Sequence, residues 1–375
     1  MKVVITDVGT RKSFDVINIF QKVYKHNLIL CSSKDFNFQL PMIYLQKVEK
    51  LRINNYKDFE NDLDQLLLKF KGEELVYLPL SEKTTKNLYK YLRKKTSPNL
   101  SFLLPDEDVF FKTGDKIRFQ QYCEENIFPI PLSHNVKDLK QMKFRHLIVK
   151  PRVGEGSVGI IHIDKKEHFK ILKEMDLTNY VIQDKIISSK KVSGAFFLCK
   201  DGDVVSSYSH QRIRTFPSKG GVTIFSKSTN NNEIESIGSK LLKSMNWNGF
   251  AMIEFLYDDL NKEWKIIELN PRIWGSILLS TFIGNDMLND YVKICLKEPT
   301  EEKEDKKNGY IRWIYPFEFL KLIKKEVSIK EFFIINKKET AYINFTYSTP
   351  YRSLMYILYF TFNFSSIKRF FKKID

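Results

Sequence analysis

The chain has 375 residues, 43% hydrophobic and 28% charged, and its formal net charge is +16. This length suits two or three domains, and the balance is that of a globular protein rather than a disordered or fibrous chain. No apolar run approaches the roughly 20 residues that span a bilayer, and no zinc-finger, RNA-binding or basic-heptad pattern accompanies the charge. We therefore expect no nucleic-acid partner, and the charge indicates a solvated surface, an anionic substrate or a membrane surface.

The spacing of the cysteines bears on the cellular compartment of the protein. The four of them are scattered without C-x-x-C spacing, which argues against a zinc site or a disulfide framework and favours a reduced, cytoplasmic setting. The first residues run directly into strand-like sequence, so we expect no signal peptide.

Residues 1–108 predict an α/β domain. Strand patterns at 2–9, 27–31 and 75–79 alternate with amphipathic stretches at 14–24 and 58–71. Strand and helix alternation with short loops predicts a doubly wound parallel sheet. No G-x-G-x-x-G follows the first strand, so a dinucleotide-binding function is disfavoured.

Residues 109–298 carry most of the candidate chemistry. A helix is predicted near 116–126, followed by a strand at 147–150 that ends in Lys150. The glycine-rich segment after it lets backbone N–H groups approach a phosphate closely, although the G-K-[ST] ending of a P-loop is missing. An ordinary hairpin turn is the alternative, and the adjacent lysine favours phosphate.

Two arginines mark a candidate anion site further along. Strands at 194–199 and 204–210 are joined by a tight turn at 200–203. Arg212 and Arg214 then share a strand face, so both guanidinium groups could hold one carboxylate or phosphate, or both could be solvated on an edge strand.

A hairpin carries the candidate metal site. Runs rich in β-branched and aromatic residues at 250–257 and 264–270 flank a polar loop and predict antiparallel strands, with a helix at 231–245 beneath them. Glu254 and Glu268 lie equally far from the middle of the loop, so they would sit opposite each other, with Asn270 on the face of Glu268. Two carboxylates and an amide oxygen are ligands that magnesium accepts. The alternative is a solvated hairpin face, which the apolar neighbours of these acids disfavour.

Residues 299–375 predict a small basic and aromatic extension. The charged run at 301–307 is typical of a solvated linker. The segment 351–373 mixes apolar residues with a basic tail, which fits either a helix docked on the core or an amphipathic helix on an anionic membrane.

The order of these elements over residues 1–298 resembles the ATP-grasp superfamily, in the branch of carbamoyl-phosphate-synthase-like and carboxylate–amine ligases. The strongest element is 253–255 followed by Glu-Leu-Asn-Pro-Arg at 268–272. The resemblance implies a parallel-sheet domain (1–108), an ATP-grasp domain of two α+β subdomains clamping ATP (109–298), and an extension (299–375).

The resemblance also implies roles for individual residues. The implied metal ligands for Mg²⁺ or Mn²⁺ are Glu254, Glu268 and Asn270, and Arg272 would support the transferred phosphoryl group. In the family a glutamate holds the ribose of the nucleotide, but residues 188–195 contain no acid. Asp184 is the candidate to take its place. The implied nucleotide contacts are Lys116, Lys150, Gly154, Glu155, Gly156, Ser157, Gly159, Gln183, Asp184 and Ile186. For the acid substrate we expect contacts from His210, Arg212, Arg214, Gly220 and Gly221.

The function that follows is an ADP-forming ligase, which joins a small-molecule carboxylate to an amine through an acyl phosphate. The alternatives are a thiol acceptor, a phosphorylated product, and a non-catalytic membrane-surface protein that retains the fold. Resemblance to this branch suggests cell-surface polysaccharide or amino-acid-conjugate biosynthesis, by analogy only. The sequence leaves the substrates and the oligomeric state open.

Overall fold

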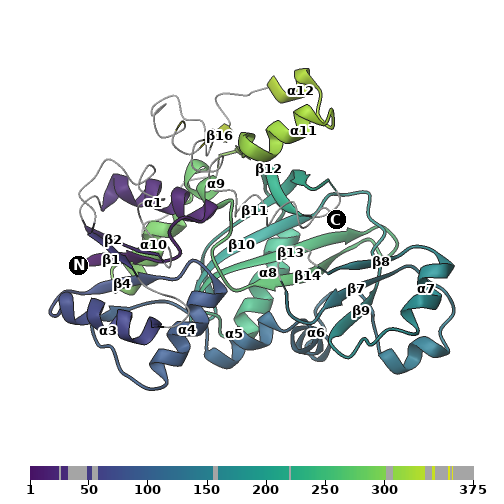
Figure 1. The fold of residues 1–375 in the computed structure, drawn as a ribbon, viewed down its shortest axis with the longest axis horizontal. Helices are drawn as coiled ribbons and strands as arrows, with labels where there is room; N and C mark the ends of the chain where they lie inside the picture. Colours follow the sequence, from purple (N-terminus) through teal and green to yellow (C-terminus); the bar gives the residue numbers. More distant parts are fainter. Residues whose placement is uncertain are drawn as a thin grey trace.

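The fold is known from a computed structural model. It describes residues 1–24, 27–32, 49–52, 58–154, 159–218, 221–300, 307–333 and 340–342, together with Leu354 and Ile357. Three sheets organise these residues: a parallel sheet near the N-terminus, a small antiparallel sheet, and a large sheet between them (Figure 1).

The N-terminal sheet is parallel and covered on both faces. Its strand order is β3-β2-β1-β4-β5. Side chains alternate between the two faces of a strand. Val3 and Ile5 of β1 therefore pack on the face covered by helix α1, whereas Val4 packs on the opposite face, which α3 and α4 cover. This is the predicted doubly wound arrangement. The strands are β1 (Lys2–Ile5), β2 (Leu28–Ser32), β3 (Glu49–Arg52), β4 (Leu75–Leu78) and β5 (Leu100–Ser101), and the helices are α1 (Arg11–Val23), α3 (Phe59–Lys69) and α4 (Glu82–Leu92).

A small lobe follows two linking helices, α5 (Glu107–Gly114) and α6 (Lys116–Glu125). Its antiparallel sheet has the order β6-β9-β7-β8 and a hydrophobic core of its own, which includes residues of helix α7 (Figure 1). The elements are β6 (Ser133–His134), the 3-10 helix η3 (Val136–Lys140), β7 (Leu147–Pro151), β8 (Ile161–Ile163), α7 (Lys166–Leu172) and β9 (Tyr180–Asp184).

The large sheet has the order β14-β13-β10-β11-β12-β15-β16. Helix α8 (Asn232–Ser244) packs against it closely: a Cβ on Gly238 would lie 2.5 Å from the ring of Phe197 and 3.2 Å from Ile253. The helix therefore packs against the sheet beneath the hairpin, as predicted. The five central strands are β10 (Ser193–Lys200), β11 (Asp203–Phe216), β12 (Val222–Thr229), β13 (Gly249–Asp258) and β14 (Glu263–Asn270).

The segment after residue 298 does not form a separate extension in its described part. Strand β15 (Tyr310–Arg312) pairs antiparallel with β12, and β16 (Thr340–Tyr342) pairs with β15, so both continue the large sheet. A short π-helix, η4 (Ile314–Glu318), leads into helix α11 (Phe319–Ile323), and α12 (Ile329–Phe333) follows (Figure 1). The predicted boundary at 299 therefore falls inside one sheet. The linker at 301–306 and nearly all of 351–373 lie outside the described residues.

Two helices after the hairpin, α9 (Ile277–Phe282) and α10 (Met287–Cys295), pack with α1 in one hydrophobic cluster. The parallel-sheet domain and the large sheet are thus joined by a common core. In the part of the chain that the structure describes, no helix is long and apolar enough to cross a membrane. The predicted α/β and α+β fold class is confirmed.

Candidate active site

The hairpin of β13 and β14 places two carboxylates opposite each other. Glu254 pairs with Glu268 in the antiparallel register, as predicted, and Met252 pairs with Asn270. A β-bulge follows immediately, because Phe255 pairs with Ile266. A bulge bends its strand and changes the direction of neighbouring side chains, and this one lies next to the two acids, on the edge strand β14 and its neighbour β13.

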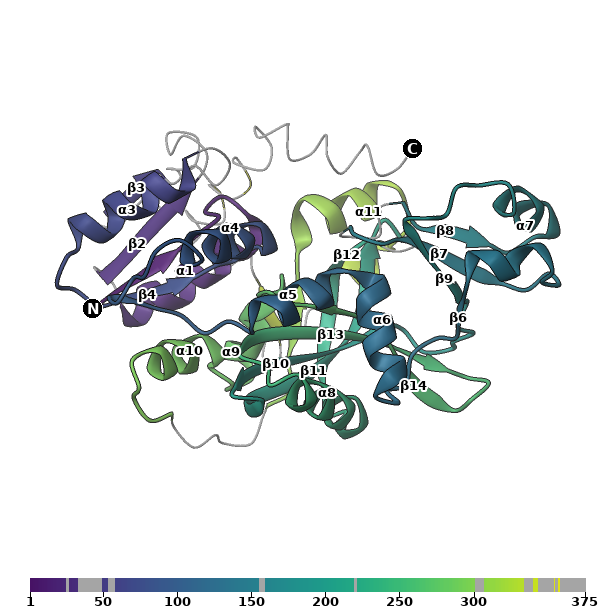
Figure 2. The same ribbon diagram turned by 90° about the horizontal axis from the view of Figure 1, so that it is seen from below.

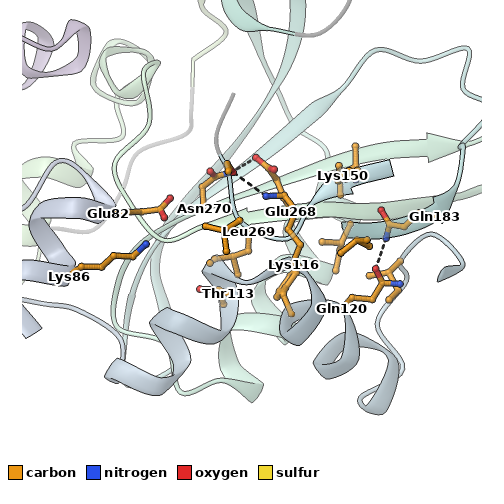
Figure 3. Close-up of a pocket in the computed structure, with 18 residues that line it drawn as sticks. Glu82, Lys86, Thr113, Lys116, Gln120, Lys150, Gln183, Glu268, Leu269 and Asn270 are labelled. Carbon is orange, nitrogen blue, oxygen red and sulfur yellow. Dashed lines mark hydrogen bonds between the residues drawn. The ribbon is translucent and has the colours of Figure 1, made fainter. Parts of the chain in front are cut away.

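Asn270 links the second carboxylate to an arginine. Its amide nitrogen donates to Glu268 Oε1 at 2.8 Å (Figure 3). Its Oδ1 accepts from Arg272 Nη2 at 3.1 Å. Arg272 Nε also lies 3.4 Å from Oε1 of Glu82, on α4. Helix α4 of the N-terminal domain therefore reaches the site, which the sequence analysis missed.

The electrostatics of the acids fit a divalent cation. Glu254 forms an ion pair with Arg212, and both side chains are largely buried. Burial raises the pKa of Glu254, Arg212 opposes that shift, and the neighbouring Glu268 adds to it. No group of three His, Cys, Asp or Glu side chains that could hold a metal occurs among the described residues. The candidate set is instead two carboxylates and an amide oxygen, a combination that suits magnesium when phosphate oxygens complete its shell.

Lys150 faces this acidic pair from the small lobe. It is at the end of β7 and only 5% exposed. Burial lowers its pKa to about 8, while Glu268 and Glu254 favour the charged form and Lys116 opposes it. Lys116 begins helix α6 and donates from Nζ to the carbonyl of Gly154 at 3.0 Å. The two predicted phosphate-binding lysines therefore share one site.

A pocket of about 760 Å³, open to solvent, joins these groups. The predicted site residues that line it are Lys116, Lys150, Gly154, Gln183, Glu268 and Asn270. Nε2 of Gln183 donates to Oε1 of Gln120 at 2.7 Å. Figure 3 shows this pair on one side of the pocket and two side chains of α4 on the other. The lining residues that the sequence analysis missed include Glu82, Lys86, Thr113, Phe119 and Gln120.

Two expected nucleotide contacts lie elsewhere. Asp184 ends β9, where it binds His134 at 2.7 Å and approaches Arg145 at 3.4 Å, so it does not line the pocket. Ile186 lines a different pocket, beside Arg214. Asp184 is therefore occupied by local partners and does not replace a ribose-binding acid in this geometry.

The glycine-rich segment is described only at its ends. Gly154 lines the pocket, and Gly159 has a φ of +74° with Pro151 Cγ 2.9 Å from where a Cβ would stand. Glycine is thus required there, because side chains avoid this backbone region. Glu155, Gly156 and Ser157 lie outside the described residues.

A second pocket, of about 730 Å³, adjoins the first through Glu268. Its walls include His210, Arg212, Gly221 and Arg272, together with Glu254. Burial lowers the pKa of His210 to about 3, and Arg212 adds to the shift, so the imidazole is neutral at physiological pH. Of the residues predicted for the acid substrate, this pocket contains His210, Arg212 and Gly221, and Gly220 lies outside the described residues.

Arg214 is the exception among the described acid-substrate residues. The register of β11 against β12 shifts on both sides of Arg214. Its guanidinium binds Glu318, which is 0% exposed, whereas Arg212 binds Glu254. The two arginines thus hold different carboxylates, although both line the pocket that also contains Ile186.

Comparison with known proteins agrees with this geometry. Residues 113–276 match the family model described as the ATP-grasp domain. No curated protein matches the sequence. Solved structures of similar fold include biotin carboxylase from Campylobacter jejuni (13% identity, TM-score 0.64, 82% of this chain and 74% of that chain covered). They also include N5-carboxyaminoimidazole synthetase from Staphylococcus aureus (14% identity, TM-score 0.64, 87% and 85% covered). At these identities the likeness shows the fold.

Proposed function

We propose that this chain, whose residues 113–276 form an ATP-grasp domain, is an ADP-forming ligase that joins a carboxylate to an amine. The observation that carries the proposal is the meeting of Glu254, Glu268 and Asn270 with the buried Lys150 at the wall shared by two pockets. In such an arrangement the two carboxylates can bind a metal ion while the lysine binds the phosphate that the metal also holds.

The first pocket is assigned to Mg-ATP. Lys116 and Lys150 would bind its phosphates, and the hairpin acids with Asn270 would hold Mg²⁺ or Mn²⁺, which supplies charge neutralisation at the phosphates. Nucleotide complexes of the same fold support the assignment: a biotin carboxylase domain from Hydrogenobacter thermophilus was solved with MgADP and bicarbonate. The carboxyaminoimidazole synthase of Aspergillus clavatus was solved with ADP and 5-aminoimidazole ribonucleotide.

The second pocket is assigned to the acid. Arg212 and Arg272 would orient its carboxylate, while the neutral His210 can donate or accept a hydrogen bond without adding charge. A carboxylate oxygen attacks the terminal phosphorus of ATP and ADP leaves, giving an acyl phosphate. The amine then attacks the acyl carbon, the C–O bond to phosphate breaks, and the nitrogen loses a proton. The residues bind and orient these groups, as phosphoryl transfer requires.

The test is substrate-dependent ADP release across a panel of carboxylates and amines. We expect Glu268→Gln to lower turnover by about 100-fold or more, because the loss of one group that stabilises developing charge has effects of this size. Glu263→Gln is the matched control, since Glu263 lies on the same strand at the hairpin turn and is 44% exposed. Calorimetry should show weaker Mg-dependent nucleotide binding in Glu268→Gln alone.

Wild-type turnover in Glu268→Gln would remove the metal assignment. Mass analysis of the product separates an amide from a thioester or a phosphorylated acid, the two other outcomes of the same nucleotide chemistry. The membrane-surface alternative depends on residues 351–373, and vesicle co-sedimentation of the full chain tests it.

A further inference from the structure

A third pocket lies beyond the acid pocket, between the segment that follows β9, the end of β11 and the C-terminal helices. It is an open pocket of about 1140 Å³, a volume that includes space continuous with the solvent. Arg212 lines both this pocket and the acid pocket. A molecule in the third pocket would therefore lie next to the ion pair of Arg212 with Glu254. Residues outside the matched ATP-grasp domain, Lys321 and Glu331 among them, form its outer wall.

The outer wall is held by a buried ionic cluster. Glu318 of η4 is 0% exposed and binds Arg214 from β11 and Arg312 from β15, the second at 2.9 Å. Arg312 also donates to the carbonyl of Phe332 in α12 at 3.0 Å. Because a buried charge is costly without its partners, these contacts fix the C-terminal helices over the sheet. Figure 2 shows α11 beside β12, and the residues of this region that line the pocket include Lys321.

The pocket has an excess of positive charge. Among the charged side chains that line it or form ion pairs with its lining, cations outnumber carboxylates by six to four. The cations are Lys190, Lys191, Arg212, Arg214, Arg312 and Lys321. The carboxylates are Glu254, Glu318, Glu326 and Glu331. Arg212, Arg214, Arg312 and Lys321 each have a carboxylate partner.

Lys191 is the cation left for a ligand. Its Nζ donates to the carbonyl of Ile213 at 2.8 Å, which holds it beside the end of β11. No carboxylate of the described residues forms an ion pair with it. Lys190 instead lies over the ring of Tyr257, 3.3 Å from its centroid.

We propose that this third pocket binds an anionic group, a carboxylate or a phosphate, of the amine-bearing substrate. The inference rests on the proposed function, because a ligase must hold a nucleotide, an acid and an amine at once. The first and second pockets share the lining residue Glu268, and the second and third share Arg212. The amine would then approach the acyl phosphate past Arg212, with its anionic end against Lys191.

Calorimetry on the full chain tests the proposal. The nucleotide and terminal-phosphate positions are first filled with Mg²⁺ and β,γ-imido-ATP, and inorganic phosphate or malonate is then titrated. We expect one probe to bind the wild type, and Lys191→Gln to weaken it at least tenfold, which corresponds to about 1.4 kcal/mol. Lys191→Arg should restore binding. Lys200→Gln, which changes an exposed lysine at the far end of β10, should not alter it.

The outcomes separate the alternatives. Preference for phosphate indicates a phosphorylated amine, and preference for malonate a carboxylated one. Equal probe binding by wild type and Lys191→Gln would overturn the inference, as would the absence of any probe binding. Weaker β,γ-imido-ATP binding in Lys191→Gln would assign the pocket to the nucleotide and also overturn it. None of these results depends on Glu268→Gln, so the ligase proposal stands or falls separately.

Discussion

Binding of a magnesium nucleotide beside Lys150 should draw a proton from solution. This lysine is 5% exposed, and burial lowers its pKa to about 8. Anionic phosphates next to an ammonium group favour its charged form and raise its pKa toward the ordinary value of about 10.4. The nucleotide therefore binds most tightly to the protonated enzyme, and binding is linked to proton uptake.

The size of the effect follows from the pKa. At pH 8 about one half of Lys150 is deprotonated before binding, so uptake should be about half a proton, rising to about nine tenths at pH 9 and falling to about one hundredth at pH 6. The dissociation constant of Mg-ADP should rise with pH above 8, reaching about tenfold its pH 6 value at pH 9. The sign is fixed, because a group whose pKa rises on binding takes up protons.

Calorimetry in buffers of different ionisation enthalpy measures this uptake directly. The control is Lys150→Arg, which keeps the positive charge but does not titrate in this range. Its binding should be independent of pH between 6 and 9. A wild-type dissociation constant that stays flat over this range, with no proton uptake at pH 9, would refute the placement of Lys150 against the phosphates.

Two stability predictions concern the framework of the site. Glu318→Gln should lower the free energy of unfolding by about 3 kcal/mol, because it leaves the buried Arg312 and the partly buried Arg214 without their counter-charge. Denaturant titration should show no such loss for Glu331→Gln, which changes an exposed carboxylate. Gly249→Ala should cost more than Gly284→Ala. Both glycines have φ near +87°, so an alanine at either position adds backbone strain of about 1–2 kcal/mol. At Gly249 the new Cβ would also lie 2.3 Å from the backbone oxygen of Leu103, whereas at Gly284 it would meet no atom within 4 Å. Equal thermal shifts for the two variants would contradict this account.

The hairpin could be predicted from the sequence because its information is local. Two strand-forming runs and a short polar loop determine an antiparallel register, and that register sets Glu254 against Glu268. The bulge could not be predicted, since a single shifted pair leaves no mark in the residue pattern. It moves the pairing of Phe255 to Ile266 without disturbing the acids.

The parts that the sequence did not predict depend on contacts between distant residues. Glu82 reaches Arg272 across 190 positions, and a charged residue in the first turn of a helix gives no sign of such a partner. Strand β15 is three residues long, so its pairing with β12 has no recognisable pattern. The partners of Asp184 come from β6 and the loop before β7, and only the folded lobe shows that they occupy this carboxylate.

The shared core of α1, α9 and α10 determines which part of the molecule can move during turnover. The N-terminal domain cannot rotate away from the large sheet without exposing the buried side chains that both contribute to that cluster. The small lobe, in contrast, has an independent core and carries Lys150 at the end of β7. If the cleft closes over a nucleotide, we expect this lobe alone to move, which would carry Lys150 toward a stationary pair of acids.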